Sequence, residues 1–588
     1  MKKRYNKALA FILALTLTGS LASCGSSDQS KSGTPSDMPV SRNSPETNSV
    51  SVKTDTAGEK AGASGITADN TDNGDAATEA EEAPAVAADV KGNQSVERII
   101  ADAEYMTGGD MTTDMPLPDP GFDGEEYKQL DENGYTFVKD APLSTFSTDV
   151  DTASYANARR MLTMGWQVNR DSVRAEEFIN YFSYDYEKPD AEHPIAVTTE
   201  LSECPWNSKA KLLLVGVQAK DIERETRAPL NLVLLIDVSG SMRGDDRLPL
   251  VKQAVKMLAE SLNANDRVSI VTYSGEEKIV LEGAAGSDYD KIAAAVDSLE
   301  AEGCTAGEAG INMAYKLAED NFIQGGNNRI VMATDGDLNV GISSEEELKA
   351  LVEKKREGGV FLSVLGFGAG NLKDARLEAL ADNGNGNYSY IDSEREAKKV
   401  LLSELNATLI TVAKDVKAQI EFNPANVEAY RLVGYENRLL ADEDFTDDTK
   451  DAGEMGAGHS STALYEIIPV KGVLGSAGLG GSSDDEPEPA TADPEELLSV
   501  KLRYKLPDGD TSTELSKPVM VKDYTAKAGA NLAFASCAAE YAMYLRGSQY
   551  SKLTPADISK QLTEDLLTDE YRQEFAELLK MAKELYGE

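Results

Sequence analysis

Short apolar runs alternate with amphipathic segments between about Pro229 and Leu405. The apolar runs are nearly unbroken and rich in β-branched residues, as in Leu232–Ile236 and Val360–Leu365. Such runs are typical of parallel strands covered on both faces. The segments between them repeat apolar residues at steps of three and four, which predicts helices. The alternation predicts a doubly wound α/β domain with a mostly parallel sheet over residues 229–405.

The regions on either side of this domain have a different pattern. Alternating or apolar segments separated by polar turns predict strands. These segments are Ile195–Glu200, Lys211–Gln218, Val416–Phe422, Val427–Gly434, Thr462–Pro469, Leu498–Tyr504 and Lys517–Val521. Together they predict a β-sandwich-like scaffold, residues 191–228 and 406–525, into which the α/β domain is inserted. Residues 475–496 are Gly/Ser-rich and then acidic, which predicts a mobile hairpin loop.

Helical patterns lie at the two ends of the folded part. Residues 141–190 predict a small helical module that follows a strand end near Phe146. Residues 526–588 predict a second helical module. In its last helix Tyr571, Phe575, Leu578, Ala582 and Leu585 lie on one face, which is typical of a face that packs on a core.

The first 140 residues have no pattern of a packed core. Residues 1–24 have a basic start and an apolar stretch, which predicts a secretory signal. The stretch ends in Leu21-Ala-Ser-Cys24, which resembles the lipobox of bacterial lipoproteins and implies a diacylglyceryl anchor on Cys24. Several acyl chains on one residue would attach the protein firmly to a membrane. Residues 25–140 are polar and acidic, which predicts a disordered tether. Its last stretch, from Met106 to about Asp140, either continues this tether or wraps loosely on the first domain.

The charge of the chain narrows the range of partners. The 588 residues carry 58 Lys and Arg against 101 Asp and Glu, a formal net charge of −43. This excess of carboxylates repels phosphate backbones and anionic lipid headgroups, so we expect no nucleic acid partner. With only 2 histidines, the chain cannot build a His-rich zinc site.

Oxygen-bearing side chains gather where three predicted loops meet the sheet. Asp237, Ser239 and Ser241 follow the first strand, Thr305 precedes a helix, and Asp335 ends a later strand. Ligands of such sheets bind outside the carboxyl ends of the strands. Two carboxylates and three hydroxyls suit a hard cation, Mg²⁺ above all, and Mn²⁺ or Ca²⁺ would also fit. The pattern therefore predicts a divalent-cation site.

The spacing of these residues resembles the metal-ion-dependent adhesion site of von Willebrand factor type A domains. Longer blocks, among them Phe146–Tyr155 and Ala333–Gly341, are similar to bacterial von Willebrand A-domain lipoproteins of the YfbK type. The resemblance implies that Asp237, Ser239, Ser241, Thr305 and Asp335 hold the cation and leave one position open. A Glu or Asp carboxylate of a protein or peptide partner would fill that position. The implied protein is a lipid-anchored binding or adhesion protein of the extracytoplasmic face, and not an enzyme.

Other interpretations remain open. A structural or assembly protein of the envelope is one alternative, and a metal-assisted hydrolase is another. A hydrolase needs a general base near the ion, for which Asp245, Asp246, Glu308 and Asp337 are the candidates.

Two local patterns suggest other chemistry. Asp335, Asp337 and Asn339 imitate an EF-hand loop, but Val340 stands where that loop needs Gly, and the run follows a strand. His459 lies beside two serines without a nucleophile elbow, which favours a hydrogen-bonding loop residue. The pairing of Cys204, Cys304 and Cys537 stays open.

Overall fold

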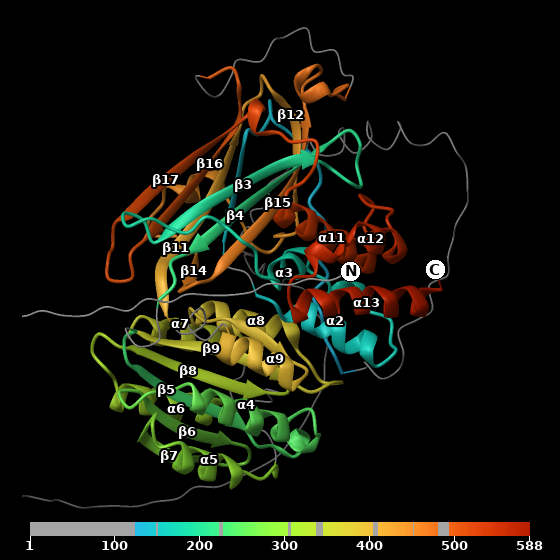
Figure 1. Cartoon of the computed structure of the whole chain (residues 1–588). Coiled ribbons are helices and arrows are strands. Elements are labelled where there is room, and N and C mark those ends of the chain that lie inside the picture. Colours follow the sequence, from blue (N-terminus) through green and yellow to red (C-terminus); the bar gives the residue numbers. More distant parts are fainter. Residues whose placement is uncertain are drawn as a thin grey trace, which may run out of the picture. The chain divides into compact units, whose positions relative to one another are not determined.

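The computed structural model describes residues 124–148, 151–222, 227–303, 307–336, 345–403, 410–450, 452–479 and 493–587 (Figure 1). All of them belong to the same structural unit, Ala87–Glu588. Cys24, Cys304, Thr305 and Asp337 lie outside the described residues. None of the described helices is long and apolar enough to cross a membrane.

The inserted domain is built on a six-stranded sheet in the order β10-β9-β8-β5-β6-β7. Its strands are β5 (Leu230–Asp237), β6 (Arg267–Tyr273), β7 (Glu277–Ala285), β8 (Asn327–Thr334), β9 (Val360–Phe367) and β10 (Tyr388–Ile391). All neighbouring pairs are parallel except β6 and β7, which are antiparallel. The predicted mostly parallel sheet is confirmed. The sequence pattern missed the edge strands β7 and β10.

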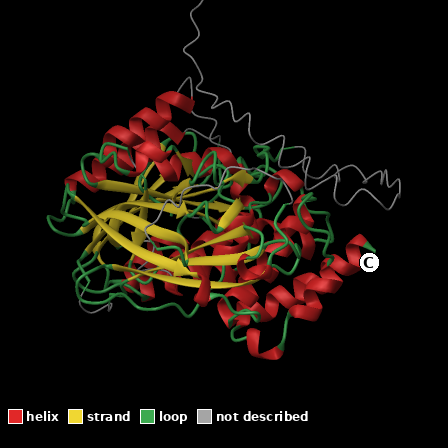
Figure 2. Cartoon of the chain, turned by 90° about the horizontal axis from the view of Figure 1, so that it is seen from above, coloured by secondary structure: helices red, strands yellow, loops and turns green. Residues whose placement is uncertain are grey.

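Helices cover both faces of this sheet, as the alternation along β5 requires. Leu232, Leu234 and Ile236 pack in the same core as residues of α4, whereas Val233 and Leu235 pack with α6. The helices are α4 (Leu248–Glu260), α5 (Tyr289–Asp297), α6 (Gly307–Asp320), α7 (Glu345–Arg356), α8 (Asp374–Asn383) and α9 (Glu394–Lys398). Because helices pack on both faces of the sheet, the domain is doubly wound. Figure 2 shows the helices and strands of the whole chain from above.

The scaffold consists of two antiparallel sheets. One has the order β1-β12-β15-β4-β3 and the other β13-β2-β11-β16-β17, with β14 paired to β11. The strands are β1 (Thr136–Phe137), β2 (Leu143–Ser147), β3 (Ile195–Glu203), β4 (Lys211–Ala219), β11 (Thr411–Phe422), β12 (Val427–Val433), β13 (Leu439–Leu440), β14 (Gly453–Gly456), β15 (Ser460–Pro469), β16 (Glu496–Lys505) and β17 (Ser512–Met520). Side chains of both sheets, such as Ile420 and Ile467, share one core. Because the α/β domain lies between β4 and β11 in the sequence, the prediction of a domain inserted in a β-sandwich-like scaffold is confirmed.

The two predicted helical modules form one layer. The helices are α2 (Ala153–Thr163), α3 (Ala175–Asn180), α11 (Ala530–Arg546), α12 (Pro555–Gln561) and α13 (Glu570–Tyr586). Phe178 of α3, Phe534 of α11 and Phe575 of α13 belong to one core with Leu214 and Leu464 of the scaffold. Helices that precede and follow the scaffold in the sequence therefore cover the outer face of the β4–β15 pair together.

Two expectations need correction. The predicted tether ends before residue 140, because Tyr135 and Val138 are buried and β1 pairs with β12. Residues 475–496 do not close a hairpin, since β15 and β16 lie in different sheets. The free thiols Cys204 and Cys537 do not pair with each other.

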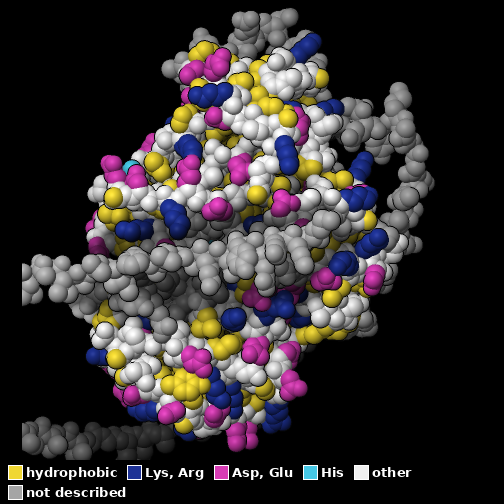
Figure 3. All heavy atoms as spheres, in the orientation of Figure 1, with side chains coloured by type: hydrophobic (Ala, Val, Ile, Leu, Met, Phe, Trp, Pro, Cys, Tyr) yellow, Lys and Arg dark blue, Asp and Glu magenta, His cyan; other side chains and the backbone are white. Residues whose placement is uncertain are grey.

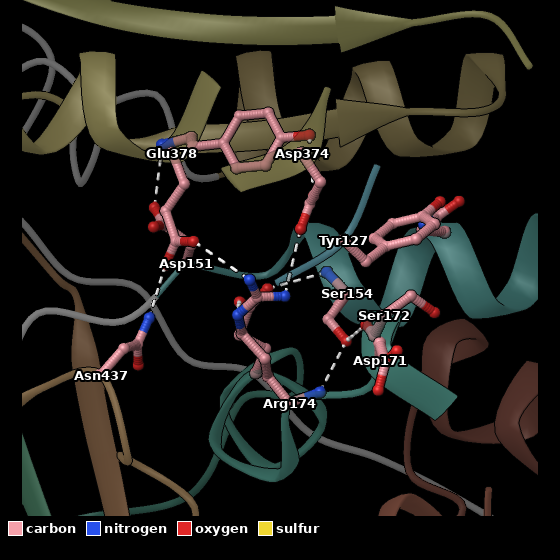
Figure 4. A network of polar contacts seen from close by, with 12 residues as sticks. Tyr127, Asp151, Ser154, Asp171, Ser172, Arg174, Asp374, Glu378 and Asn437 are labelled. Carbon is pink, nitrogen blue, oxygen red and sulfur yellow. Dashed lines mark hydrogen bonds and ion pairs between the residues drawn. The ribbon is translucent and has the colours of Figure 1, made fainter. Parts of the chain in front are cut away.

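A buried polar network joins the α/β domain to the helical layer (Figure 4). The guanidinium of Arg174 lies 3.1 Å from Asp374 and 3.3 Å from Glu378 of α8. Arg438 pairs with Glu378 and Asp151, and Asn437 donates a hydrogen bond to Glu378 at 2.7 Å. Burial raises the pKa of Glu177, a further neighbour of Arg174, to about 8, although the positive charge of Arg174 lowers it. These carboxylates therefore depend on the arginines for their charge balance.

Removing Arg174 should uncouple this network. We expect Arg174→Met to lower the free energy of unfolding by about 3–5 kcal/mol, because buried carboxylates lose their counter-charge. Arg395→Gln is the matched control, since the Arg395 side chain is 44% exposed in its ion pair with Glu574 and an exposed pair contributes about 0–1 kcal/mol. Urea unfolding of the two variants measures the difference. Equal losses would contradict the role given to Arg174.

Candidate metal-ion site at the carboxyl edge of the sheet

The first predicted ligand loop begins where β5 ends. Asp237 is the last residue of β5 and is fully buried. Its Oδ1 accepts a hydrogen bond of 2.8 Å from the backbone N–H of Ser239. The hydroxyls of Ser239 and Ser241 lie 2.9 Å apart. The loop thus brings three of the five predicted ligands together.

Asp335 reaches the same place from the neighbouring strand. β8 pairs with β5 in parallel, with Ala333 opposite Ile236. Asp335 follows β8 directly and is fully buried. Thr334 Oγ1 donates a hydrogen bond of 3.4 Å to Asp237 Oδ2, a contact that the sequence analysis missed. Asp335 follows a strand and not a helix, which argues against an EF-hand.

The loop that leads toward Thr305 contacts the first ligand loop. Gly303 O accepts a hydrogen bond of 3.1 Å from the N–H of Gly240, and Glu302 N–H donates one of 2.7 Å to Val238 O. Thr305 lies outside the described residues, so its role as a ligand stays a prediction. The described geometry brings Asp237, Ser239, Ser241 and Asp335 together.

The two carboxylates of the site, Asp237 and Asp335, are both removed from solvent. Burial and the negative charge of Asp335 together raise the pKa of Asp237 to about 6, although hydrogen bonds from Ser239 lower it. A carboxylate in a dry site favours either a proton or a cation. In the described part of the chain, no three His, Cys, Asp or Glu side chains gather as a metal site. The donor set here is instead two carboxylates with hydroxyl oxygens, which fits a hard cation.

Arg247 is a further residue of the site that sequence reasoning missed. Its Nη1 lies 3.8 Å from Asp335 Oδ2. The same guanidinium donates hydrogen bonds to Ser241 O and, at 2.6 Å, to Ala369 O. It thus bridges the first ligand loop and the loop after β9. Its place in the sequence, directly before α4 and close to an acidic loop, could have indicated that it belongs to the site.

The N-terminal part of the described chain supports the loop after β9. Glu125 Oε1 accepts a hydrogen bond of 2.7 Å from Gly370 N–H, and Glu126 N–H donates one of 3.0 Å to Leu372 O. Gly336, with φ of +95°, lies so close to this loop that a Cβ would be 2.9 Å from Lys373 N. The left-handed backbone and the close approach both favour glycine. The loop thereby packs directly behind Asp335.

The candidate general bases have different positions. Asp246 Oδ2 accepts a hydrogen bond of 3.1 Å from Ala369 N–H, which gives it a role in holding the loop. Asp245 is exposed and Glu308 lies in the first turn of α6. Asp337 lies outside the described residues.

Comparisons with known proteins agree with this architecture. Residues 231–406 match the family model for the von Willebrand factor type A domain, residues 121–214 match that for von Willebrand factor, and residues 407–585 match that for the C-terminal part of protein YfbK. The chain is 44% identical to "Uncharacterized protein YfbK" of Escherichia coli over 467 residues, 78% of this chain and 80% of that protein. It is 32% identical to human inter-alpha-trypsin inhibitor heavy chain H3 over 29% of this chain and 20% of that one.

A solved structure, a von Willebrand factor type A protein from Catenulispora acidiphila, is 15% identical, covers 68% of this chain and 91% of that chain, and has a TM-score of 0.38. The A domain gives the chain a protein-interaction function of the adhesion type. The match to YfbK extends through the scaffold and the helical layer as well as the A domain. The chain therefore belongs to the YfbK family of proteins that contain a von Willebrand factor type A domain.

Proposed function

We propose that this chain is a lipid-anchored binding protein of the extracytoplasmic face, which captures a carboxylate of a protein partner through a divalent cation. Asp237, Ser239, Ser241, Asp335 and Thr305 would hold the ion. The observation that carries the proposal is the pair of fully buried carboxylates, Asp237 and Asp335, at the ends of adjacent strands. The cationic side chain of Arg247 lies 3.8 Å from Asp335.

The donor set favours binding over catalysis. Two carboxylates balance the formal charge of a divalent ion. The hydroxyl oxygens that add to its coordination are neutral and weaker ligands, so the ion keeps affinity for one more anionic oxygen. A Glu or Asp of a partner supplies such an oxygen. Mg²⁺ is the favoured ion, because it accepts an incomplete protein cage and keeps waters, and Mn²⁺ or Ca²⁺ would serve the same donors.

The surface charge supports a protein partner over nucleic acid. On the face in Figure 3, acidic and basic side chains are interspersed, and its described part has no extended basic surface. With a net charge of −43, non-specific attraction to a phosphate backbone is absent.

Replacing one buried carboxylate should weaken metal binding. We expect Asp237→Asn to weaken Mn²⁺ binding at least about tenfold in calorimetry, since the loop keeps a similar shape but loses one negative charge. Asp245→Asn is the matched control, because Asp245 is an exposed acid next to the same loop. Chelation should reproduce the effect of Asp237→Asn on capture of partners from envelope extracts. Equal capture by the wild type, Asp237→Asn and the chelated protein would refute the proposal.

Arg247 tunes the same site electrostatically. Its positive charge close to Asp335 opposes a second cation, so we expect Arg247→Gln to tighten Mg²⁺ binding several-fold. Arg243→Gln is the control, since Arg243 is exposed and donates a hydrogen bond of 3.0 Å to Ala301 O. Titration calorimetry of the two variants gives the comparison. Weaker binding by Arg247→Gln would mean that its bonds to Ser241 O and Ala369 O matter more than its charge.

The membrane anchor of the proposal rests on Cys24. We expect Cys24→Ser to move the protein from the membrane fraction to the soluble extracytoplasmic fraction and to abolish labelling with radioactive palmitate, because the thiol is the acceptor of the lipid. Cys537→Ser is the control, since that thiol is buried in α11. Unchanged labelling of Cys24→Ser would exclude this anchor.

A further inference from the structure

A cleft of about 210 Å³ lies where the α/β domain returns to the scaffold. The α/β domain contributes Arg329 near the start of β8 and Asn385 before β10. The scaffold contributes Arg438 and, from β14, Glu454. Because β8 begins at the cleft and ends at Asp335, the cleft and the proposed metal site lie at opposite edges of the sheet.

Arg329 is exceptional among the buried arginines of the described chain. Seven arginines there are less than 9% exposed. They are Arg159, Arg160, Arg174, Arg227, Arg329, Arg431 and Arg572. Six of them have a carboxylate within 4 Å. Arg329, which is 3% exposed, donates one hydrogen bond of 2.7 Å to the hydroxyl of Ser363 and has no described carboxylate within that distance.

A buried guanidinium without an anionic partner is costly, so proteins usually supply one. Burial lowers the pKa of Arg329 to about 10, which is the direction expected of such a group. The Nε–H of Arg329 has no hydrogen-bond acceptor among the described residues. The guanidinium lines the cleft, so a ligand there can supply the missing anion.

The other charges of the cleft favour a ligand that is not a simple anion. The second arginine, Arg438, already pairs with Asp151, Glu378 and Asp382. Glu454 lines the same cleft as Arg329, and its negative charge raises the pKa of Arg329 from a separation greater than that of an ion pair. Asn385 Nδ2 donates a hydrogen bond of 3.3 Å to Glu454 Oε1. A guanidinium and a carboxylate thus line one cleft without contacting each other.

Asn385 has an unusual backbone. Its φ is +48°, in the left-handed region that non-glycine residues seldom adopt. Such strain is common where a side chain is held for a ligand. Arg356 Nη1 fixes that side chain by donating a hydrogen bond of 2.8 Å to Asn385 Oδ1.

We propose that this cleft binds a small zwitterion, a free amino acid or a dipeptide, with its carboxylate on Arg329 and its ammonium group toward Glu454. The volume corresponds to about seven waters at roughly 30 Å³ each, which is the size of such a ligand. Because both the α/β domain and the scaffold line the cleft, the bound ligand would join the two.

Titration calorimetry with glycylglycine, L-alanine, acetate and methylammonium tests the proposal, in the presence of a chelator so that the metal site takes no part. We expect the two zwitterions to bind the wild-type chain more tightly than acetate or methylammonium. Arg329→Gln should weaken zwitterion binding about tenfold or more, since a charged hydrogen bond is lost. Glu454→Gln should weaken the zwitterions and leave acetate unchanged or tighter. Arg395→Gln, at an exposed position outside the cleft, should bind like the wild type.

Circular dichroism shows whether each variant is folded. If Arg329→Gln does not fold, zwitterion binding to Glu454→Gln tests the proposal. Equal binding of acetate and glycylglycine, with no effect of Glu454→Gln, would overturn the zwitterion in favour of a simple anion. Failure of every probe to bind the wild type at millimolar concentration would overturn the site itself. Either result leaves the proposed metal site unaffected, because that site is tested by Mn²⁺ binding.

Discussion

Buried ion pairs between arginines and carboxylates hold the α/β domain to the rest of the molecule. Arg159 of α2 contacts Asp392 and Glu396 of the α/β domain and Glu574 of α13. Neither partner could stay dry alone, because the desolvation of an isolated charge exceeds what any single contact returns. When the helical layer and the α/β domain pack together and exclude water, each of these charges needs its partner, since a misaligned interface would leave buried charges unpaired.

The same constraint reaches the candidate metal edge. Arg160, next to Arg159, pairs with Glu125, and Glu125 accepts the hydrogen bond of Gly370 in the loop behind Asp335. The chain that emerges from the N-terminal region is thus built into the support of the site. Residues 124–127 and α2 therefore share contacts with the loop behind Asp335.

Three arginines differ in how many carboxylates lie near them, and this difference distinguishes a role in the fold from a role in binding. Arg174 is surrounded by carboxylates and serves the fold. Arg247 has one carboxylate at 3.8 Å and stands where a cation is expected. Arg329 has none within ion-pair distance in the described chain and lines a cleft. A buried charge that the protein already pairs with an opposite charge contributes little to ligand binding. A buried charge without such a partner favours an oppositely charged ligand.

The sequence alone determined most of the local elements and predicted a set of metal ligands. Short, nearly unbroken and β-branched-rich apolar runs predicted β5, β6, β8 and β9 as strands of a mostly parallel sheet. The Asp-x-Ser-x-Ser spacing put Asp237, Ser239 and Ser241 on one loop, and Asp335 followed from its place after β8. The edge strands β7 and β10 were missed because β7 is largely exposed, with a weak apolar pattern, and β10 is short.

Only the tertiary structure decided what depends on pairing between distant segments. The first and last helices share one layer, residues 475–496 connect two sheets, and Tyr135 is part of the core. The sequence also does not show which arginine lacks a nearby carboxylate. That depends on which side chains folding brings within a few ångströms. Local propensity and hydrophobic period are properties of short segments, whereas burial and ion pairing are properties of the assembled fold.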